Sequence, residues 1–398
     1  MKLICSCESL KGETMRRVWR ISLEFSAYYL SFYLCRYSVL PLLPSIAAEV
    51  GLSYGQLAAS ISMLYAGYAL ALTPSGLAAA AVGAWRLLLG SAAVTVLANL
   101  LLALARDWIT ISLLLFVNGL AQGAAWPSLM QAVAVEFRGS DVDYVVGAML
   151  TAALFGPSAA FLLASLVMYV ANWRVAFVAS AAPLAALSPV IAAGRRGRRG
   201  EPRGEALGAV KRLAIWLLGM AYACHYALLR GLLSWLPTML VEVEGLEPPT
   251  ASLLSGAVPL ASACIAVVGA LLSRRTSPWS VIALSFAAAA LLTTYSLATG
   301  LSAAVATAVI LALSLSEWLY FTQLPQLLPP REVGLASGLV DTLGYAGSSL
   351  GTMLLASAVE GKCPAGAVLI PLAGLSAAVA LRLRGPGGDM DFRRRRVC

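Results

Sequence analysis

Hydrophobic residues along this chain gather in long apolar stretches, which short polar or basic segments separate. An α-helix needs about 20 mostly apolar residues to cross a bilayer. The pattern therefore predicts an all-α membrane protein with twelve transmembrane helices. The predicted spans are 20–43, 54–80, 86–105, 109–135, 143–170, 174–193, 213–241, 250–272, 278–299, 303–328, 333–359 and 364–382.

Composition excludes several other classes of protein. The chain is 60% hydrophobic and 12% charged, which is too apolar for a soluble domain. Its net charge of +9 comes from tails and loops without a basic face interleaved with aromatic residues, so we expect no nucleic-acid partner. The seven cysteines form no C-x-x-C pair, and no enzyme motif or repeated metal-ligand spacing occurs. We therefore expect no catalytic residues, no metal and no cofactor.

The positive charges indicate how the chain is oriented. Of the 28 Lys and Arg residues, 23 fall on the side of the two termini, and only Arg106, Arg174 and Lys362 fall on the opposite side. Basic residues accumulate in cytoplasmic loops. The bias predicts a multi-pass protein of the plasma membrane with both termini in the cytoplasm.

A basic break in the middle divides the predicted helices into two sets of six. We expect a cytoplasmic tail at 1–19, a six-helix bundle at 20–193, a basic linker at 194–212, a second bundle at 213–383 and a basic tail at 384–398. Two pseudo-symmetric six-helix bundles with a site near the bilayer midplane are typical of many secondary transporters.

Two arginines remain inside predicted spans, in segments that resemble one another. Y-Y-L-S-F-Y-L-C-R-Y-S-V-L-P-L-L-P contains Arg36, and Y-A-C-H-Y-A-L-L-R-G-L-L-S-W-L-P contains Arg230. Counted from Arg20 and Arg212, they lie roughly 24 and 27 Å into the bilayer. A cation at this depth costs about 2.5–3.5 kcal/mol, and it is usually functional.

The arginine pair favours an anion site, because guanidinium groups bind phosphate or carboxylate bidentately. The alternative is that both arginines are structural and are satisfied by carbonyls or acids. Two cations about 10 Å apart repel by roughly 1.7 kcal/mol at a dielectric constant of about 20. An anion would reverse this repulsion, so the loaded carrier should reorient faster than the empty one, as in an exchanger.

Several other polar and aromatic residues are candidates for the same site. The hydroxyls of Tyr29, Tyr33 and Tyr226 lie on the arginine faces, although aromatic packing explains them equally well. Gln122 and Trp126 are candidates to line the pathway, with helix–helix packing as the alternative.

Two acids and one histidine also fall in the spans. Asp341 and Glu317 could hold an arginine as a counter-ion, carry a proton, or simply be protonated and hydrogen-bonded. His225 is five residues from Arg230 and points away from it, which favours packing over a proton relay.

With these motifs the chain resembles the major facilitator superfamily, and within it the organophosphate/phosphate antiporters of glycerol 3-phosphate and hexose phosphates. The likeness rests on Y-L-C-R, on L-L-R followed by S-W-L-P, on N-G-L-A-Q-G-A-A-W-P from Asn118, and on G-x-x-x-G followed by G-Y-x-G between Pro329 and Gly347. It implies the major facilitator fold, a cavity lined by spans 1, 4, 5, 7, 10 and 11, and phosphate binding by Arg36 and Arg230.

The chain departs from the family pattern at two places. The acidic-basic motif between spans 2 and 3 reads G-L-A-A-A-A-V-G-A-W-R from Gly76, with alanines at Ala80 and Ala81. The family's span-5 histidine is absent, since its place falls at Ala152 or Ala153. The first departure implies a different gating contact, and the second bears on the substrate.

We therefore predict a monomeric secondary transporter, which moves a small anionic phosphorylated metabolite by alternating access in exchange for inorganic phosphate. One alternative is a proton-coupled transporter of carboxylates or other anions. The other is a phosphate-ester sensor of the same family that does not transport.

Overall fold

The computed structural model describes residues 2–137, 140–194, 211–328, 330–359, 370–376 and 378. These residues form α-helices joined by short turns, without a β-strand in the described ranges. The helices are α1 (Lys2–Tyr37), α2 (Val39–Val50), α3 (Tyr54–Val82), α4 (Ala84–Leu102), α5 (Trp108–Gly123), α6 (Ala125–Glu136), α7 (Ser140–Val170), α8 (Trp173–Gly194), α9 (Leu213–Glu242), α10 (Pro248–Arg275), α11 (Pro278–Thr299), α12 (Ala303–Ser314), α13 (Leu319–Leu327) and α14 (Pro330–Val359).

The helices confirm the predicted all-α membrane fold. Ten segments of the described residues are long and apolar enough to cross a membrane, and they coincide with the first ten predicted spans. The eleventh predicted span corresponds to α14. Most of the predicted linker at 194–212, most of the twelfth span at 364–382 and the whole tail at 384–398 lie outside the described residues.

The chain divides into two compact units. The first consists of Met1–Gly204 with Gly245–Leu260, and the second of Glu205–Glu244 with Ala261–Cys398. The stretch Gly245–Leu260 joins the first unit through α7, where Ser252 Oγ donates a hydrogen bond to the carbonyl of Phe161 (2.8 Å).

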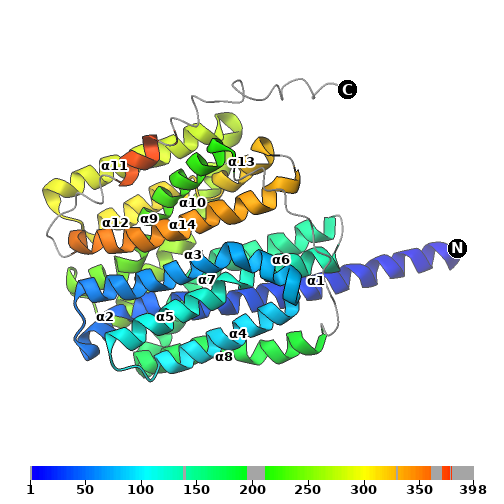
Figure 1. Cartoon of the computed structure of the whole chain (residues 1–398), viewed down its shortest axis with the longest axis horizontal. Helices are drawn as coiled ribbons and strands as arrows, with labels where there is room; N and C mark the ends of the chain where they lie inside the picture. The colour runs from blue at the N-terminus through cyan, green and yellow to red at the C-terminus, as the bar shows by residue number, and fades with distance from the viewer. Residues whose placement is uncertain are drawn as a thin grey trace. The chain divides into compact units, whose positions relative to one another are not determined.

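Two helix pairings, of α1 with α7 and of α4 with α5, recur in the second unit as α9 with α14 and α11 with α12. In the first unit α1 packs against α7, α3 against α5 and α4 against α5 and α8; in the second unit α9 packs against α14 and α11 against α12 (Figure 1). Spans 1 and 5 are thus paired in one unit, as spans 7 and 11 are in the other. Such a repeated plan is what an internal duplication of six helices produces.

The first helix is longer than its apolar stretch. α1 begins at Lys2, so the polar segment predicted as a tail at 1–19 is helical and continuous with the first span. The segment contains no proline, and helical propensity therefore carries the helix back through it.

Three spans are interrupted near their middle. α1 gives way to α2 at Ser38, where Pro41 has no N–H to donate to the carbonyl of Tyr37. α5 gives way to α6 at Ala124, where Pro127 leaves the carbonyl of Gly123 without its helical donor.

The third break, between α12 and α13, contains Glu317. Its turn is closed by hydrogen bonds over three residues, such as that from the Leu319 N–H to the Ser316 carbonyl (3.0 Å). Each of the three breaks thus places polar groups at a point where the helical ladder is interrupted.

Glycine allows α3 and α5 to approach closely. A Cβ at Gly119 would lie 2.1 Å from the carbonyl oxygen of Leu64 and 2.9 Å from the backbone nitrogen of Tyr68. Only a residue without a side chain fits against backbone at this distance. The contact fixes the part of α3 that carries Tyr68 beside the part of α5 that precedes Gln122.

Gly119→Ala should therefore destabilise the protein by about 1–3 kcal/mol, because backbone rather than a flexible side chain would have to move. Gly90→Ala is the matched control, since a Cβ there meets nothing within 4 Å. Thermal unfolding of the purified variants in detergent should show a lower midpoint for Gly119→Ala only. Equal midpoints would show that the close approach of α3 and α5 is not required.

Candidate functional site

The first arginine cluster is built around Arg36, next to the last residue of α1. Arg36 is 1% exposed, and its Nε donates a hydrogen bond to Oε1 of Gln122 (3.0 Å). The amide of Gln122 in turn donates to Oδ1 of Asn118 (2.7 Å), one turn earlier in α5. Gln122 lies just before the break at Ala124, so a buried cation meets a neutral polar side chain where a helix is interrupted.

Three tyrosine rings surround the Arg36 guanidinium group. Its central carbon lies 4.1 Å from the ring centroid of Tyr68, 5.0 Å from that of Tyr33 and 6.0 Å from that of Tyr37. Cation–π contacts of this kind stabilise a desolvated cation by about 2 kcal/mol. Tyr33 was predicted from its spacing. Tyr68 comes from α3 and gave no local signal in the sequence.

The remaining predicted residues of the first unit lie beside this cluster. The rings of Tyr29 and Trp126 pack on one another at 5.1 Å between centroids. Tyr33 is held from the other side by α7, where a Cβ at Gly156 would lie 2.5 Å from its ring. The glycine in span 5 therefore makes room for an aromatic residue of the arginine face.

The second arginine cluster is built around Arg230 in the middle of α9. Its Nη2 donates to the hydroxyl of Tyr226 (3.4 Å) and forms an ion pair with Oε1 of Glu317 (3.5 Å). Arg230 is 8% exposed and Glu317 9%. Glu317 lies in the turn between α12 and α13, so this arginine also faces a helix break.

Aromatic residues support the second cluster as well. Tyr222 packs on Tyr226 at 4.3 Å between ring centroids and on Tyr320 at 5.0 Å. A Cβ at Gly344 of α14 would lie 2.5 Å from the ring of Tyr222. The relation between a span-11 glycine and a span-7 tyrosine thus repeats that between Gly156 and Tyr33 in the first unit.

The other titratable residues of the second unit lie around this group of rings. Asp341 belongs to α14, whose Tyr345 packs on Tyr226 at 5.7 Å between ring centroids. Fully buried His225 places Nδ1 3.4 Å from the hydroxyl of Tyr320. The histidine therefore contacts the aromatic packing behind Arg230, as its position along the helix predicted.

Two contacts of Arg230 are long. Its Nη2 lies 3.4 Å from the Tyr226 hydroxyl and 3.5 Å from Oε1 of Glu317, beyond the usual range of about 2.7–3.2 Å for N–H···O hydrogen bonds. A phosphate or carboxylate accepts charge-assisted hydrogen bonds from a guanidinium at about 2.7–2.9 Å. An anion would thus bind this group more closely than its protein partners do. Among the described residues no group of three His, Cys, Asp or Glu could hold a metal ion.

Comparisons with known proteins agree with this architecture. Residues 25–352 match the sequence profile of the Major Facilitator Superfamily. Among solved structures, a bacterial homologue of the human lysosomal transporter Spinster, in an inward-facing and unoccupied conformation, has a TM-score of 0.74 at 15% identity, covering 92% of this chain and 96% of that chain. The nucleoside transporter NupG, in a mutant form, has a TM-score of 0.75 at 13% identity, covering 91% of this chain and 99% of that chain.

At these identities the similar structures establish the fold and leave the substrate open. No curated protein matches the chain by sequence.

Proposed function

The chain belongs to the Major Facilitator Superfamily, and we propose that it is a monomeric secondary transporter of the plasma membrane, with both termini cytoplasmic. It moves a small phosphorylated metabolite by alternating access, in exchange for inorganic phosphate. The observation that carries the proposal is that each unit buries one arginine within a membrane span, beside an interrupted helix and a tyrosine cluster. The proposed binding residues are Arg36, Arg230, Tyr29, Tyr33, Tyr226, Gln122 and Trp126.

The chemistry of both clusters supports an anion as the substrate. Guanidinium groups stay charged at every physiological pH and present planar pairs of N–H donors that match two phosphate oxygens. Gln122, which accepts a hydrogen bond from Arg36, is neutral, and Tyr226 and Glu317 lie at the limit of hydrogen-bond distance from Arg230. The tyrosine hydroxyls add donors for the remaining phosphate or sugar oxygens.

Exchange follows if the same anion binds both arginines. Two cations that bind one anion would repel one another in its absence, and a phosphate dianion would replace this repulsion by attraction to both. The empty carrier would then reorient slowly and the loaded one quickly.

The ion pair between Arg230 and Glu317 favours a second candidate, a proton-coupled anion transporter. A substrate anion that binds Arg230 would displace the Glu317 carboxylate, and a displaced carboxylate buried in the membrane is costly unless it takes up a proton. One proton would then accompany each anion.

Ligand-dependent thermal stability of the purified protein tests the substrate class. Ligand present at about 100 times Kd stabilises a protein by about 2.7 kcal/mol. We expect phosphate and sugar phosphates to raise the unfolding temperature and carboxylates of the same charge to raise it less. Equal shifts from both would favour a general anion transporter. Binding without flux in proteoliposomes would favour a sensor.

Replacement of the two acids within the spans distinguishes exchange from proton coupling. Glu317→Gln and Asp341→Asn should each lower phosphate exchange, the former by about tenfold because Arg230 loses a charged partner. The pH profile of exchange should stay that of the wild type, because a counter-ion is not released and protonated in each cycle. Proteoliposome uptake measured across the neutral pH range checks this.

Glu332→Gln is the matched control for that experiment. It removes an ion pair of similar length in the same unit, from Oε2 of Glu332 to Nε of Arg212 (3.4 Å), at the ends of α14 and α9. Its exchange rate should stay close to wild type. A pH optimum that moves or disappears in Glu317→Gln would show that protons are coupled to transport.

A further inference from the structure

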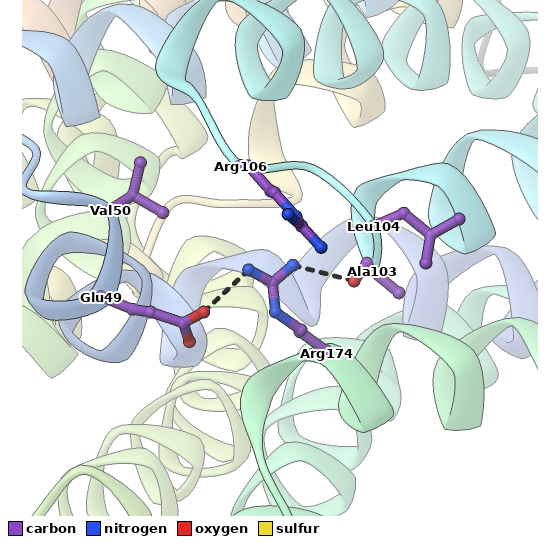
Figure 2. Close-up of a pocket in the computed structure, with 6 residues that line it drawn as sticks. All are labelled: Glu49, Val50, Ala103, Leu104, Arg106 and Arg174. Atoms are coloured by element: carbon purple, nitrogen blue, oxygen red, sulfur yellow. Dashed lines mark hydrogen bonds and ion pairs between the residues drawn. The ribbon is translucent and has the colours of Figure 1, made fainter.

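A second group of cations lies in the first unit, outside the Arg36 cluster. It lines a cavity of about 420 Å³ formed where α2 ends, where α4 passes into α5 and where α8 begins (Figure 2). Glu49, at this cavity, comes thirteen residues after Arg36, which is roughly 20 Å of helical rise. The cavity is therefore distinct from the first arginine cluster. Its lining residues are Glu49, Val50, Ala103, Leu104, Arg106 and Arg174.

Arg174 connects several of the segments that line this cavity. Its Nη1 donates hydrogen bonds to the carbonyls of Ala103 (2.9 Å) and Ala105 (2.8 Å), which follow the C-terminus of α4. Its Nη2 forms an ion pair with Oε1 of Glu49 (2.8 Å). These contacts connect the turn between α4 and α5 to the C-terminal end of α2 and the N-terminal end of α8. They therefore fix the position of Arg106 in that turn.

Both acids close to Arg106 are already engaged with other groups. The second oxygen of Glu49 accepts a hydrogen bond from Nε1 of Trp173 (2.5 Å). Asp107 caps α5, accepting from the backbone N–H and the hydroxyl of Thr110 (2.9 and 2.7 Å). These hydrogen bonds lower the pKa of the Asp107 carboxyl, and the bond from the Thr110 backbone N–H has the larger effect. The carboxylate is therefore ionised, and it contacts Thr110.

Arg106 is left as the uncompensated charge of the cavity. Figure 2 shows its side chain directed into the cavity toward the guanidinium group of Arg174. Within the part of the chain that the structure describes, neither a hydrogen bond nor an ion pair involves the Arg106 side chain. The residues that line the cavity thus include two guanidinium groups and one carboxylate, which is paired with Arg174, so the lining carries a net positive charge.

We infer that this cavity binds a phosphate group, with the Arg106 guanidinium as the principal ligand and Arg174 holding the turn in place. A guanidinium without a partner in a concave site with a net positive charge matches a phosphate monoanion or dianion. The site is separate from the proposed transport site, and each stands without the other.

The phosphate could belong to a soluble molecule or to the headgroup of an anionic phospholipid. Exposed apolar side chains flank Arg106, including Leu104 (72% exposed) and Trp108 (37%). Aromatic residues next to arginine are typical of the membrane–water interface, where lipid phosphates lie. The chemistry of binding is the same for both sources, so the experiment has one arm for each.

Protection of an introduced thiol tests the inference at the site itself. Leu104→Cys places a reactive group at the rim of the cavity, and peptide mass spectrometry reports its labelling rate separately from the native cysteines. In lipid-free detergent, inorganic phosphate at about ten times Kd should slow labelling by about tenfold relative to chloride at equal ionic strength, because only the unoccupied fraction reacts. In nanodiscs, phosphatidylglycerol should slow labelling relative to phosphatidylcholine if the lipid is the source.

Four variants make the result specific: one removes the proposed ligand and three are controls. Arg106→Gln should abolish protection in both arms, whereas Arg275→Gln, which removes an exposed arginine of the second unit, should leave it unchanged. Arg36→Gln should also keep it, which separates this cavity from the transport site. A thiol introduced by Val243→Cys, at an exposed position of the second unit, should not be protected.

Protection by free phosphate, by phosphatidylglycerol or by both supports the inference and identifies the source. Labelling that is unaffected in both arms, or protection that survives Arg106→Gln, would overturn it.

Discussion

Arg36→Ala should abolish phosphate exchange in proteoliposomes, while the protein still inserts and runs as a single species in detergent. Truncating one partner of a buried, charge-assisted contact costs about 2–5 kcal/mol, which corresponds to a loss of about 30-fold or more in kcat/KM. The side chain of Gln122 and the ring of Tyr68 remain, but the cation that they contact is gone, so an anion would enter a site that no longer compensates its charge.

Arg36→Lys separates charge from geometry. The ammonium keeps the positive charge but not the planar fork, and the rings of Tyr33 and Tyr68 contact a guanidinium in this structure. We expect the lysine variant to fail nearly as completely as the alanine variant. If Arg36→Lys exchanged phosphate at close to the wild-type rate, a point charge alone would suffice and bidentate binding would be wrong.

Loss of Arg230 should have a similarly large effect, but its partner must be considered. Arg230→Ala leaves Glu317 as a buried carboxylate without its ion-pair partner, and breaking one side of a buried pair destabilises a protein by about 3–5 kcal/mol. The charge-balanced double variant Arg230→Met with Glu317→Gln avoids this cost. It should unfold near the wild-type temperature and yet not exchange phosphate.

The two arginines should also act as one unit. After Arg36→Ala has removed binding, adding Arg230→Met and Glu317→Gln should cost little more, because residues that hold the same anion are strongly non-additive. Proteoliposome exchange rates of the single, paired and combined variants measure this. Losses that simply multiply would indicate two independent sites.

The fold could be predicted from the sequence because the bilayer allows few backbone structures. A chain that crosses a membrane must satisfy its backbone internally, so long apolar stretches become helices. The first ten predicted spans are helices at nearly the predicted bounds. Counting residues along the chain placed Arg36 and Arg230 within spans, and both are buried in helices that could cross a membrane.

Contacts that depend on a second helix could not be predicted in this way. Tyr68 contacts Arg36 only because Gly119 lets α3 approach α5. The two acids within the spans, Asp341 and Glu317, stood as equal candidates in the sequence, and the turn at 315–318 is what brings Glu317 to Arg230. The Glu49 and Asp107 carboxylates beside Arg106 accept hydrogen bonds from Trp173 and Thr110 instead of from Arg106. The spacing of residues along the sequence does not reveal these contacts.

Direct binding of a phosphorylated ligand tests the central claim most simply. Because the cavity at Arg106 would also bind phosphate, all proteins in this titration carry Arg106→Gln. Calorimetric titration of this full-length protein with inorganic phosphate and a sugar phosphate should give a measurable affinity, with or without the control Arg275→Gln. For Arg36→Gln, and for Arg230→Met with Glu317→Gln, the affinity should fall by about 30-fold or more. Near wild-type affinity in these folded variants would show that the buried arginines are structural, and the proposed phosphate exchange would be wrong.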